Sequence, residues 1–486
     1  MRILLVFPPS RRILRTTQPS FVAGSKGTTP PLGLLYVASA IRAQTGHQVK
    51  VLDLQLPGSS YQDLAREMKA YQPHVVGVST ITFMLLDAMD TVAQVRRAAQ
   101  GLAHEIKVVC GGPHVTIFPA ETARQPGVDF AIAGEAEYSF PALLENMHDE
   151  AALAQIPGVS FLSGDEVISG PEAQLIMDLD AVARPDRRLI PYERYASILA
   201  SGGLMTTMMT SRGCPFKCIF CDRLGKVFRP ISAENVVAEM SDCVDLGIRE
   251  FFLHDDTFTV QRKRVLKICE LIGERGWNIT LDCRSRVNTI DEEQIIALKR
   301  AGCRRISFGV ESGTPRIIER IKKGITLEQA KIAFALARKH GIITLADFMI
   351  GHPDETVEDV KRTIRFARDL NPDYAQFSIT TPYPATELYR EAMERGIIAG
   401  DVWREFALHP DESFEPPRWD AIISKEQLVE LVHQAYKGFY MRPRFILREL
   451  RRTKSPRMLA LKAAAGAKMG LGVLQRKMAG QSGSLK

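Results

Sequence analysis

Two long runs of alternating strand-like and helix-like segments most constrain what this chain of 486 residues can fold into. In the first run, short segments rich in Val, Ile and Leu alternate with amphipathic stretches. Near-continuous apolar strands between helices are typical of a parallel sheet that is covered on both faces. The sequence therefore predicts an α/β, doubly wound, Rossmann-like domain over residues 1–150. Its expected strands are residues 3–7, 49–54, 75–78, 106–110 and 130–133.

The second run predicts another α/β unit, over residues 204–400. It contains six strand and helix units of about 30 residues each, which is too few for a closed eight-stranded barrel. We therefore expect an open, partial (β/α)6 barrel. Gly and Pro punctuate residues 151–203, which is typical of a connector. A C-terminal helical segment, 401–443, and a basic tail, 444–486, are expected to follow.

Composition narrows the class of protein. Hydrophobic residues make up 45% and charged residues 24% of the chain, as in ordinary soluble proteins. No run approaches the roughly 18 to 20 apolar residues of a spanning helix, and the first apolar stretch is too short for a secretory signal. The chain has eight cysteines, of which three are clustered. Such clustering favours a reducing compartment over a disulfide framework, so we expect a cytoplasmic protein.

Those clustered cysteines, Cys214, Cys218 and Cys221, form a C-x3-C-x2-C pattern directly after a strand-like run. Three thiolates in one tight loop can point at one metal centre. Iron-sulfur clusters usually take four cysteines, and structural zinc sites likewise take four protein ligands. Either a small molecule or a distant side chain must then complete the site.

With the aromatic Phe220 before the last cysteine, this loop resembles that of the radical S-adenosylmethionine (SAM) superfamily. The resemblance implies a 4Fe-4S cluster on the three cysteines, with SAM chelating the open iron. It assigns the stretch around Glu311 and Ser312 to SAM contacts and Arg286 to the SAM carboxylate. It places Asp255 and Asp256 at the SAM amino group or the substrate. It also implies an external electron donor, such as flavodoxin or ferredoxin. The SAM contacts expected in this way are Phe220, Asp255, Arg286, Glu311 and Ser312.

The N-terminal domain carries a different set of motifs. It lacks the G-x-G-x-x-G fingerprint, which argues against a nicotinamide cofactor. Its PPLGLLYVAS, V-x-D, GGPHVT and GEAEYSF stretches resemble the cobalamin-binding domain of one radical SAM subfamily. The cobalamin contacts that this implies are Pro31, Leu32, Ser79, Thr80, Gly111, Gly112, His114, Gly134 and Glu135. The alternative is a Rossmann-like domain without a ligand.

The cobalt axial ligand stays open, because the D-x-H-x-x-G motif of cobalamin mutases is absent. His114 is a candidate for this ligand. We favour a role for it in a turn that packs beside the corrin.

Taken together, the motifs resemble class B radical SAM methyltransferases and the anaerobic magnesium-protoporphyrin cyclase. The resemblance implies methylation of an unactivated carbon through a 5'-deoxyadenosyl radical and methylcobalamin. An oxidative cyclase or ring-rearranging enzyme acting on a tetrapyrrole or lipid is the first alternative. The second is a corrinoid-binding protein with a structural metal site. No catalytic residue is singled out, and Phe348, Gln376 and Tyr383 are the expected substrate neighbours.

The C-terminal tail is strongly basic. Residues 441–486 contain twelve Lys or Arg and one acid, in a chain with a net charge of +7. Basic amphipathic segments can lie on anionic membranes, which would suit a lipid or tetrapyrrole substrate and a peripheral membrane contact. A solvated tail is the alternative. No aromatic residue follows Phe445, which argues against stacking on nucleic acid bases.

Overall fold

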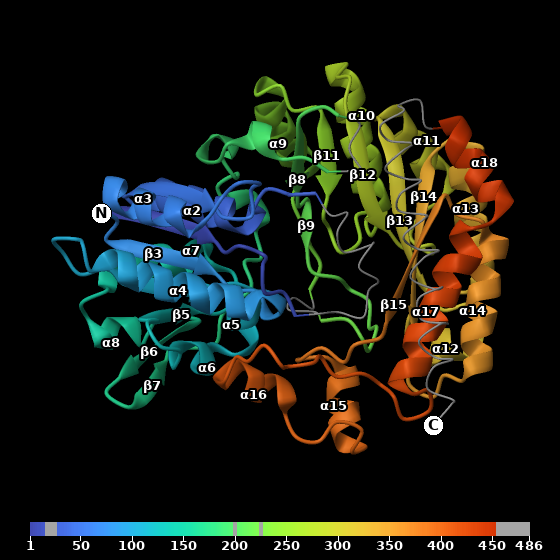
Figure 1. The fold of residues 1–486 in the computed structure, drawn as a ribbon. Helices are drawn as coiled ribbons and strands as arrows, with labels where there is room; N and C mark the ends of the chain where they lie inside the picture. The colour runs from blue at the N-terminus through green and yellow to red at the C-terminus, as the bar shows by residue number, and fades with distance from the viewer. Residues whose placement is uncertain (15–26, 198–201, 223–226, 453–486) are drawn as a thin grey trace.

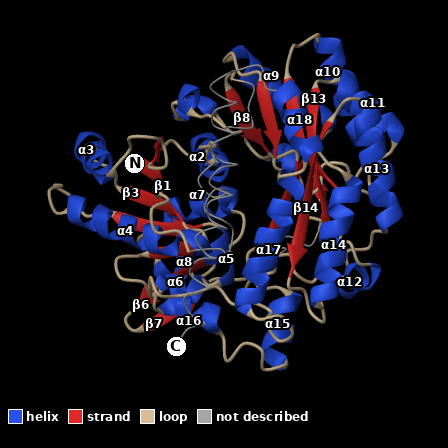
Figure 2. Ribbon diagram, turned by 45° about the vertical axis from the view of Figure 1, so that its right-hand side comes forward, coloured by secondary structure: helices blue, strands red, loops and turns tan. Residues whose placement is uncertain are grey.

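The protein, a computed structural model, is described over residues 1–14, 27–197, 202–222 and 227–452. It contains two large sheets in separate α/β units (Figure 1). Helices cover both faces of the first sheet and the outer face of the second (Figure 2). The fold class expected from the sequence is therefore confirmed.

The first sheet has seven strands in the order β2-β1-β3-β4-β5-β6-β7. Its first five strands pair in parallel, in the 2-1-3-4-5 order of a doubly wound fold. Hairpin β6–β7 pairs antiparallel with β5, so this sheet extends past residue 150 into the expected connector. The strands are β1 (Arg2–Phe7), β2 (Gln48–Asp53), β3 (Val75–Ser79), β4 (Lys107–Gly111), β5 (Phe130–Ile132), β6 (Val159–Ser163) and β7 (Glu166–Ser169).

Helices cover both faces of this sheet because its strands are apolar on both sides. One apolar cluster joins the sheet to α3 and α4, and a second joins it to α2 and α7. Three shorter helices, α5, α6 and α8, lie in the loops. The bounds are α2 (Leu32–Gln44), α3 (Tyr61–Tyr71), α4 (Leu85–Ala99), α5 (Pro113–Ile117), α6 (Pro119–Ala123), α7 (Ala136–Asn146) and α8 (Glu150–Leu153).

Beyond the hairpin, the connector is fastened to both domains. Tyr195 donates a hydrogen bond to Asp53 of the first domain at 2.9 Å. Arg187 is buried, pairs with Glu239 at 2.7 Å and donates to the Thr207 carbonyl in the second domain at 2.9 Å. A charge buried in this way is tolerable because it is paired and hydrogen-bonded.

The second sheet has six parallel strands in the order β15-β14-β13-β12-β11-β8, as expected for an open partial barrel. Along each strand, residues that face the helices alternate with residues on the inner face. The strands are β8 (Met205–Met208), β11 (Glu250–Leu253), β12 (Thr280–Ser285), β13 (Cys303–Glu311), β14 (Ile343–Ile350) and β15 (Tyr374–Ile379). The small ribbon β9 (Ser211–Arg212) and β10 (Arg229–Pro230) flanks the cysteine loop.

The helices of this unit pack on the outer face of the sheet. The short α12 was not expected from the sequence; Pro315 begins it, which suits a first helical position. The helices are α9 (Ala233–Asp245), α10 (Arg262–Arg275), α11 (Glu292–Arg300), α12 (Pro315–Arg320), α13 (Leu327–Lys339) and α14 (Val357–Leu370).

The C-terminal helices return to both domains. They are α15 (Glu387–Glu394), α16 (Val402–Leu408), α17 (Lys425–Tyr440) and α18 (Pro443–Arg452). Helix α16 docks on α6, where Gln125 donates to the Ala407 carbonyl at 2.8 Å and Arg404 pairs with Glu121 at 2.7 Å. Of the helices in the described ranges, none is long and apolar enough to cross a membrane.

Candidate functional site

The cysteine loop lies at the carboxyl end of the second sheet, between β9 and β10. Its backbone is fixed on two sides, because Ile219 donates to the Ile321 carbonyl at 3.2 Å and accepts from the Leu388 amide at 2.9 Å. Cys218 is buried, Cys214 is half-buried and Cys221 is exposed. The loop therefore presents its thiols from a backbone that α12 and α15 hold in place.

The three thiols are close enough to affect one another electrostatically. Although Cys221 is partly open to solvent, the protein atoms around its thiol limit solvation of the thiolate and raise its pKa to about 12, and the charges of Cys218, Asp256 and Cys214 add to this shift. A bound metal ion reverses that preference, because a coordinating thiol is deprotonated outright. In the described ranges, no three His, Cys, Asp or Glu side chains are arranged to hold a metal ion as they stand. The thiolate donor set itself suits iron.

Asp255 is placed differently from the expectation that it contacts SAM. Its side chain is fully buried, and its carboxylate accepts hydrogen bonds from the Thr210 amide and hydroxyl at 2.6 Å and from the Ser211 hydroxyl at 2.5 Å. Asp255 thus braces the segment that enters the cysteine loop. Its neighbour Asp256, also expected at the SAM amino group or the substrate, is exposed, and its charge helps to raise the pKa of Cys221.

Arg286 lies directly against the cysteine loop. Its guanidinium stacks 3.8 Å from the Phe216 ring centroid and donates to the Cys218 sulfur at 3.6 Å. The same group donates to the Lys323 carbonyl and, at 3.3 Å, to Asn288. Arg286 is thus held against the cysteine loop, with several of its donors already engaged by protein groups.

Glu311 forms a buried ion pair that the sequence did not reveal. It has a left-handed backbone with φ of 69° and accepts from Lys323 at 2.7 Å. A side chain at Gly309 would collide with this pair, because a Cβ atom there would lie 2.5 Å from Glu311 Oε1 and 2.7 Å from Lys323 Nζ. Gly309 thus leaves room for charged groups on the inner face of β13.

Two further polar residues, Asp347 and Arg284, lie on the inner face. Burial raises the pKa of Asp347 on β14 to about 7; Glu311 adds to this shift, and Arg284 and Lys323 oppose it. Arg284 on β12 is exposed on the same face. Asp347 could have been recognised in the sequence, because it is a charged residue inside an otherwise apolar strand.

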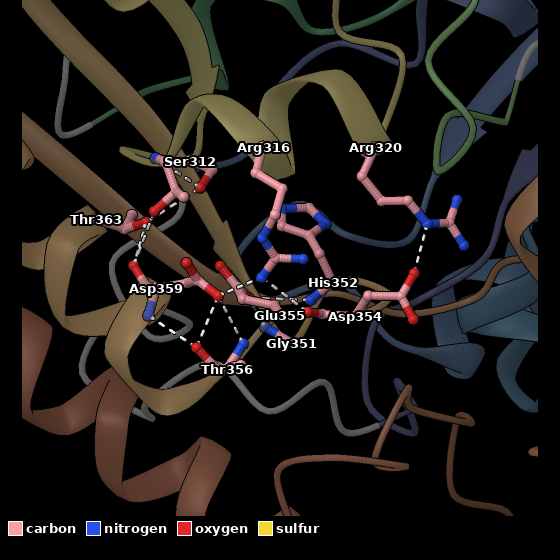
Figure 3. A network of polar contacts seen from close by, with 11 residues as sticks. Ser312, Arg316, Arg320, Gly351, His352, Asp354, Glu355, Thr356, Asp359 and Thr363 are labelled. Atoms are coloured by element: carbon pink, nitrogen blue, oxygen red, sulfur yellow. Dashed lines mark hydrogen bonds and ion pairs between the residues drawn. The ribbon is translucent and has the colours of Figure 1, made fainter.

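Ser312 is fully buried and points away from the inner face. It shares a hydrogen bond of 3.1 Å with Thr363 on α14 and accepts from the Thr314 amide at 3.2 Å. Figure 3 shows it at one end of a polar network that continues through Asp359 to Thr356 and Arg316. Ser312 therefore fastens the end of β13 to α14.

The same network fixes the segment that follows β14 (Figure 3). Glu355 accepts from the amides of Gly351 and His352 at 2.7 and 3.0 Å, and burial raises its pKa to about 7. The His352 ring lies 6.1 Å from the ring of Phe220 and bonds Thr380 at 3.2 Å. Phe220 is thereby held beside the carboxyl end of the sheet.

In the first domain, the ends of β3 and β4 are joined closely. Thr80 donates its amide to the Gly111 carbonyl at 2.7 Å and accepts from the His114 amide at 3.2 Å. Gly112 has φ of 116°, and a Cβ atom there would lie 2.9 Å from the Thr80 carbonyl oxygen. Only glycine suits this backbone. Gly134 is similar, with φ of 77° and the Ala173 Cβ atom 2.6 Å from where its own would be.

The remaining residues expected to contact cobalamin lie around these strand ends. Pro31 is buried at the start of α2, and Leu32 and Ser79 are half-buried.

His114 is buried inside the first domain. Its Nδ1 bonds the Thr82 hydroxyl at 3.2 Å, its ring lies 5.2 Å from that of Phe118, and burial lowers its pKa to about 3. Nε2 has no hydrogen-bond partner in the described residues and is itself buried. A neutral, enclosed imidazole agrees with packing beneath the strand ends.

Glu135, expected at the cobalamin, joins the two domains instead. Its two carboxylate oxygens accept from Arg229 at 2.7 and 2.8 Å, and Oε2 also accepts from the Ile176 amide at 2.8 Å. Burial acts to raise its pKa, but these hydrogen bonds and nearby arginines outweigh burial and lower it. Arg212 adds a second bridge to Glu137 at 2.5 Å. The carboxylate is thus occupied by protein donors.

The carboxyl ends of both sheets meet at the cysteine loop (Figure 1). Phe83, after β3, packs edge-on against Tyr383 and Trp403, with ring centroids 5.4 and 5.9 Å apart. Phe220 and Phe118 belong to the same apolar cluster. The cluster therefore contains residues of the cysteine loop and residues of the first domain.

The three residues expected near the substrate lie in different places. Tyr383 lies in the cluster just described, and Gln376 is on the inner face of β15. The prediction for Phe348 is wrong: it is 1% exposed and stacks on Phe377 at 5.4 Å on the outer face. A cavity of about 660 Å³ elsewhere, between the connector and α9, is lined by none of the predicted site residues.

Comparison with known proteins supports both halves of this arrangement. The radical SAM superfamily model matches residues 208–367, and the B12 binding domain model matches residues 20–144. An uncharacterized methyltransferase of Pyrococcus horikoshii is 37% identical over 455 residues, covering 93% of this chain and 95% of the relative. The anaerobic magnesium-protoporphyrin IX monomethyl ester cyclase of Rubrivivax gelatinosus is 27% identical, covering 86% of this chain and 75% of the relative.

Two solved structures share the fold. The methyltransferase TsrM from Kitasatospora setae, with cobalamin and a [4Fe-4S] cluster bound, superposes with a TM-score of 0.70 at 19% identity, covering 91% of this chain and 89% of TsrM. The cobalamin-dependent radical enzyme OxsB, with aqua-cobalamin and SAM bound, gives a TM-score of 0.74 at 18% identity, covering 96% of this chain and 71% of OxsB.

Proposed function

This chain belongs to the cobalamin-dependent radical SAM enzymes, and from that premise we propose that it methylates an unactivated carbon of a small-molecule substrate. As a member of this family it is an enzyme that uses a 4Fe-4S cluster, SAM and cobalamin. The alternative of a corrinoid-binding protein without catalysis is set aside. The substrate class that we propose is a lipid or a tetrapyrrole.

One observation carries the proposal: the apolar cluster that contains Phe220 of the cysteine loop also contains Phe83 and Phe118 of the first domain. Methyl transfer from one cofactor to a carbon activated by another requires both cofactors to face one substrate. The two arginine–glutamate bridges at the domain interface hold this alignment.

We assign the cluster to the thiolates of Cys214, Cys218 and Cys221. When bound, the three cofactors supply the radical that activates the carbon and the methyl group that it receives. Asp255 positions the strand that enters the loop, and Phe220 offers a flat apolar wall beside it. Arg286, Lys323 and Glu311 place charged groups next to the loop that match the carboxylate, amino and ribose groups of SAM.

For cobalamin we assign the closely joined ends of β3 and β4, with the start of α2. Glycine at 111 and 112 lets a flat macrocycle approach the backbone. Pro31, Leu32 and Ser79 lie around the same strand ends. We do not assign His114 as a ligand of the cobalt, because its ring nitrogens are enclosed within the first domain.

Two partners complete the proposal. The cluster needs electrons, for which we propose an external one-electron donor such as flavodoxin or ferredoxin. For the basic tail, residues 444–486, we propose a peripheral contact with an anionic membrane, since its net positive charge is high and concentrated.

Oxidative cyclisation is the second candidate, supported by 27% identity to the anaerobic cyclase. The two reactions differ in their small products, so we propose anaerobic reconstitution with iron, sulfide and hydroxocobalamin, followed by incubation with SAM and a strong reductant. Formation of 5'-deoxyadenosine with S-adenosylhomocysteine supports methyl transfer. Deoxyadenosine without S-adenosylhomocysteine, in the presence of substrate, favours cyclisation. Failure to bind SAM overturns both.

A further inference from the structure

Helix α18 carries an exposed apolar face. Ile446, Leu447 and Leu450 are 47%, 50% and 51% exposed, and Met441 just before the helix is 48% exposed. Residues 446, 447 and 450 are spaced at i, i+1 and i+4, which puts them on one side of a helix. About half of each side chain is therefore open to solvent. Such a contiguous patch at the end of a folded chain marks an interaction surface.

The opposite side of α18 anchors it to the barrel. Phe445 packs against Tyr440 with ring centroids 4.9 Å apart, and the buried Glu449 accepts from the Tyr374 hydroxyl at 3.3 Å. Arg448 donates to the carbonyls of Pro372 and Asp373 at 2.9 and 3.0 Å. The outward direction of the apolar face is therefore fixed by contacts on the other side.

Charge decides what can cover this face. Arg444 and Arg451 are exposed beside it, and residues 453–486 contain seven Lys or Arg and no acid. The basic tail, or the same face of a second copy, would bring like charges together. An anionic lipid surface instead satisfies both the apolar residues and the arginines.

We propose that α18 is the membrane-docking element of this enzyme and that it inserts Ile446, Leu447 and Leu450 among the lipids of an anionic bilayer. The proposal rests on the membrane contact proposed for the tail. It goes further, because it names the element, the inserted side chains and the orientation.

The orientation follows from the contacts of α18. The helix sits on Tyr374 and Asp373, at the amino end of β15, whereas the cysteine loop lies at the carboxyl ends of the strands. Six residues of β15 place these ends roughly 20 Å apart. The docked enzyme therefore presents its cofactor end away from the bilayer, and docking fixes the enzyme at the surface without opening its site into the lipid.

Co-sedimentation of the reconstituted full-length enzyme with vesicles tests this. One set of vesicles contains 30% phosphatidylglycerol in phosphatidylcholine, and the other is pure phosphatidylcholine. We expect binding to the first set only. Replacing Ile446 and Leu450 together by Asn should weaken this binding about tenfold or more, and replacing Arg444 and Arg451 together by Gln should weaken it about fivefold or more.

The matched control is Ile332→Asn, on α13, where the side chain is 52% exposed. It should bind like the unaltered enzyme, and all variants should keep the unaltered melting temperature. If Lys454→Gln with Arg457→Gln weakens binding while the Ile446 and Leu450 variant does not, docking belongs to the tail and the α18 proposal is wrong. If the unaltered enzyme binds neither set of vesicles, both membrane proposals fail, whereas formation of deoxyadenosine reports separately on the catalytic proposal.

Amine labelling tests the orientation. On vesicles, the exposed Lys217 of the cysteine loop should keep its reactivity, and Lys454 should lose most of its reactivity. Protection of Lys217 would contradict the orientation.

Discussion

Arg229 of the second domain donates hydrogen bonds to both carboxylate oxygens of Glu135 in the first domain, at 2.7 and 2.8 Å. The Arg229 side chain is 3% exposed and that of Glu135 is 16% exposed. A bidentate pair of this kind is specific in geometry, and loss of either partner leaves a poorly solvated charge behind. The pair thus links correct docking of the two domains to the stability of the interface where the cofactors meet.

Glu135→Ala should destabilise the interface and leave the cobalamin contacts themselves in place. We expect the free energy of unfolding to fall by about 3 kcal/mol in this variant and by a similar amount in Arg229→Ala. In the double variant, the loss should be clearly smaller than the sum of the two single losses. Urea unfolding of the four proteins measures this. Additive losses would show that the bridge contributes nothing.

Cys218→Ala should abolish the cluster, because a site with two thiolates cannot hold it. We expect loss of the visible absorption of the reconstituted cluster and no 5'-deoxyadenosine. Cys243→Ala, a buried thiol on α9, is the matched control and should keep both signals. Retention of a full complement of iron and sulfide in Cys218→Ala would remove this residue from the ligand set.

Substitutions of the neighbouring residues Asp255 and Asp256 should have different effects. Asp255→Asn weakens three buried hydrogen bonds, so we expect about 2 kcal/mol less stability and a lower iron content. Asp256→Asn, on an exposed carboxylate, should keep the stability and iron content and instead weaken SAM binding. Thermal unfolding, iron assay and equilibrium dialysis with SAM distinguish these effects. Equal effects on all three readouts would contradict the division of roles.

Glu355 should make stability depend on pH. Burial raises its pKa to about 7 in the folded protein, above the value of roughly 4.3 for an unfolded chain. Between these two values the folded state holds a proton that the unfolded state has lost, so stability falls as pH rises through this window and is level above it. Each unit of pKa shift corresponds to about 1.4 kcal/mol, so the full window changes the free energy of unfolding by about 4 kcal/mol.

Glu355→Gln removes this titration. Relative to the variant, the free energy of unfolding of the unaltered protein should fall by about 3 kcal/mol between pH 4.5 and 7.5. Urea unfolding of both proteins across this range provides the measurement. Parallel pH curves for the two would mean that Glu355 is ionised throughout.

Most elements could be read from the sequence because their signals are local. The apolar periodicity of residues 262–275, 327–339, 357–370 and 425–440 predicts helices, and the structure has α10, α13, α14 and α17 with these bounds. Apolar periodicity and capping residues, such as Thr326 and Thr356, fix helices over a few turns. The end of β13 was missed, since Gly309 and Glu311 break the apolar pattern there.

The sequence by itself determined the two α/β units, the cysteine loop and the cofactor family, because each depends on residue types at fixed spacing along the chain. Only the tertiary structure decided that Glu135 holds the domains together, that Asp255 braces the cysteine loop, and that Ser312 turns toward α14. It also revealed the Glu311–Lys323 pair and the outward apolar face of α18. These roles depend on which partners lie within hydrogen-bonding distance and on which side of a strand or helix is covered. Both are set by contacts between residues far apart in the chain, and no local pattern contains that information.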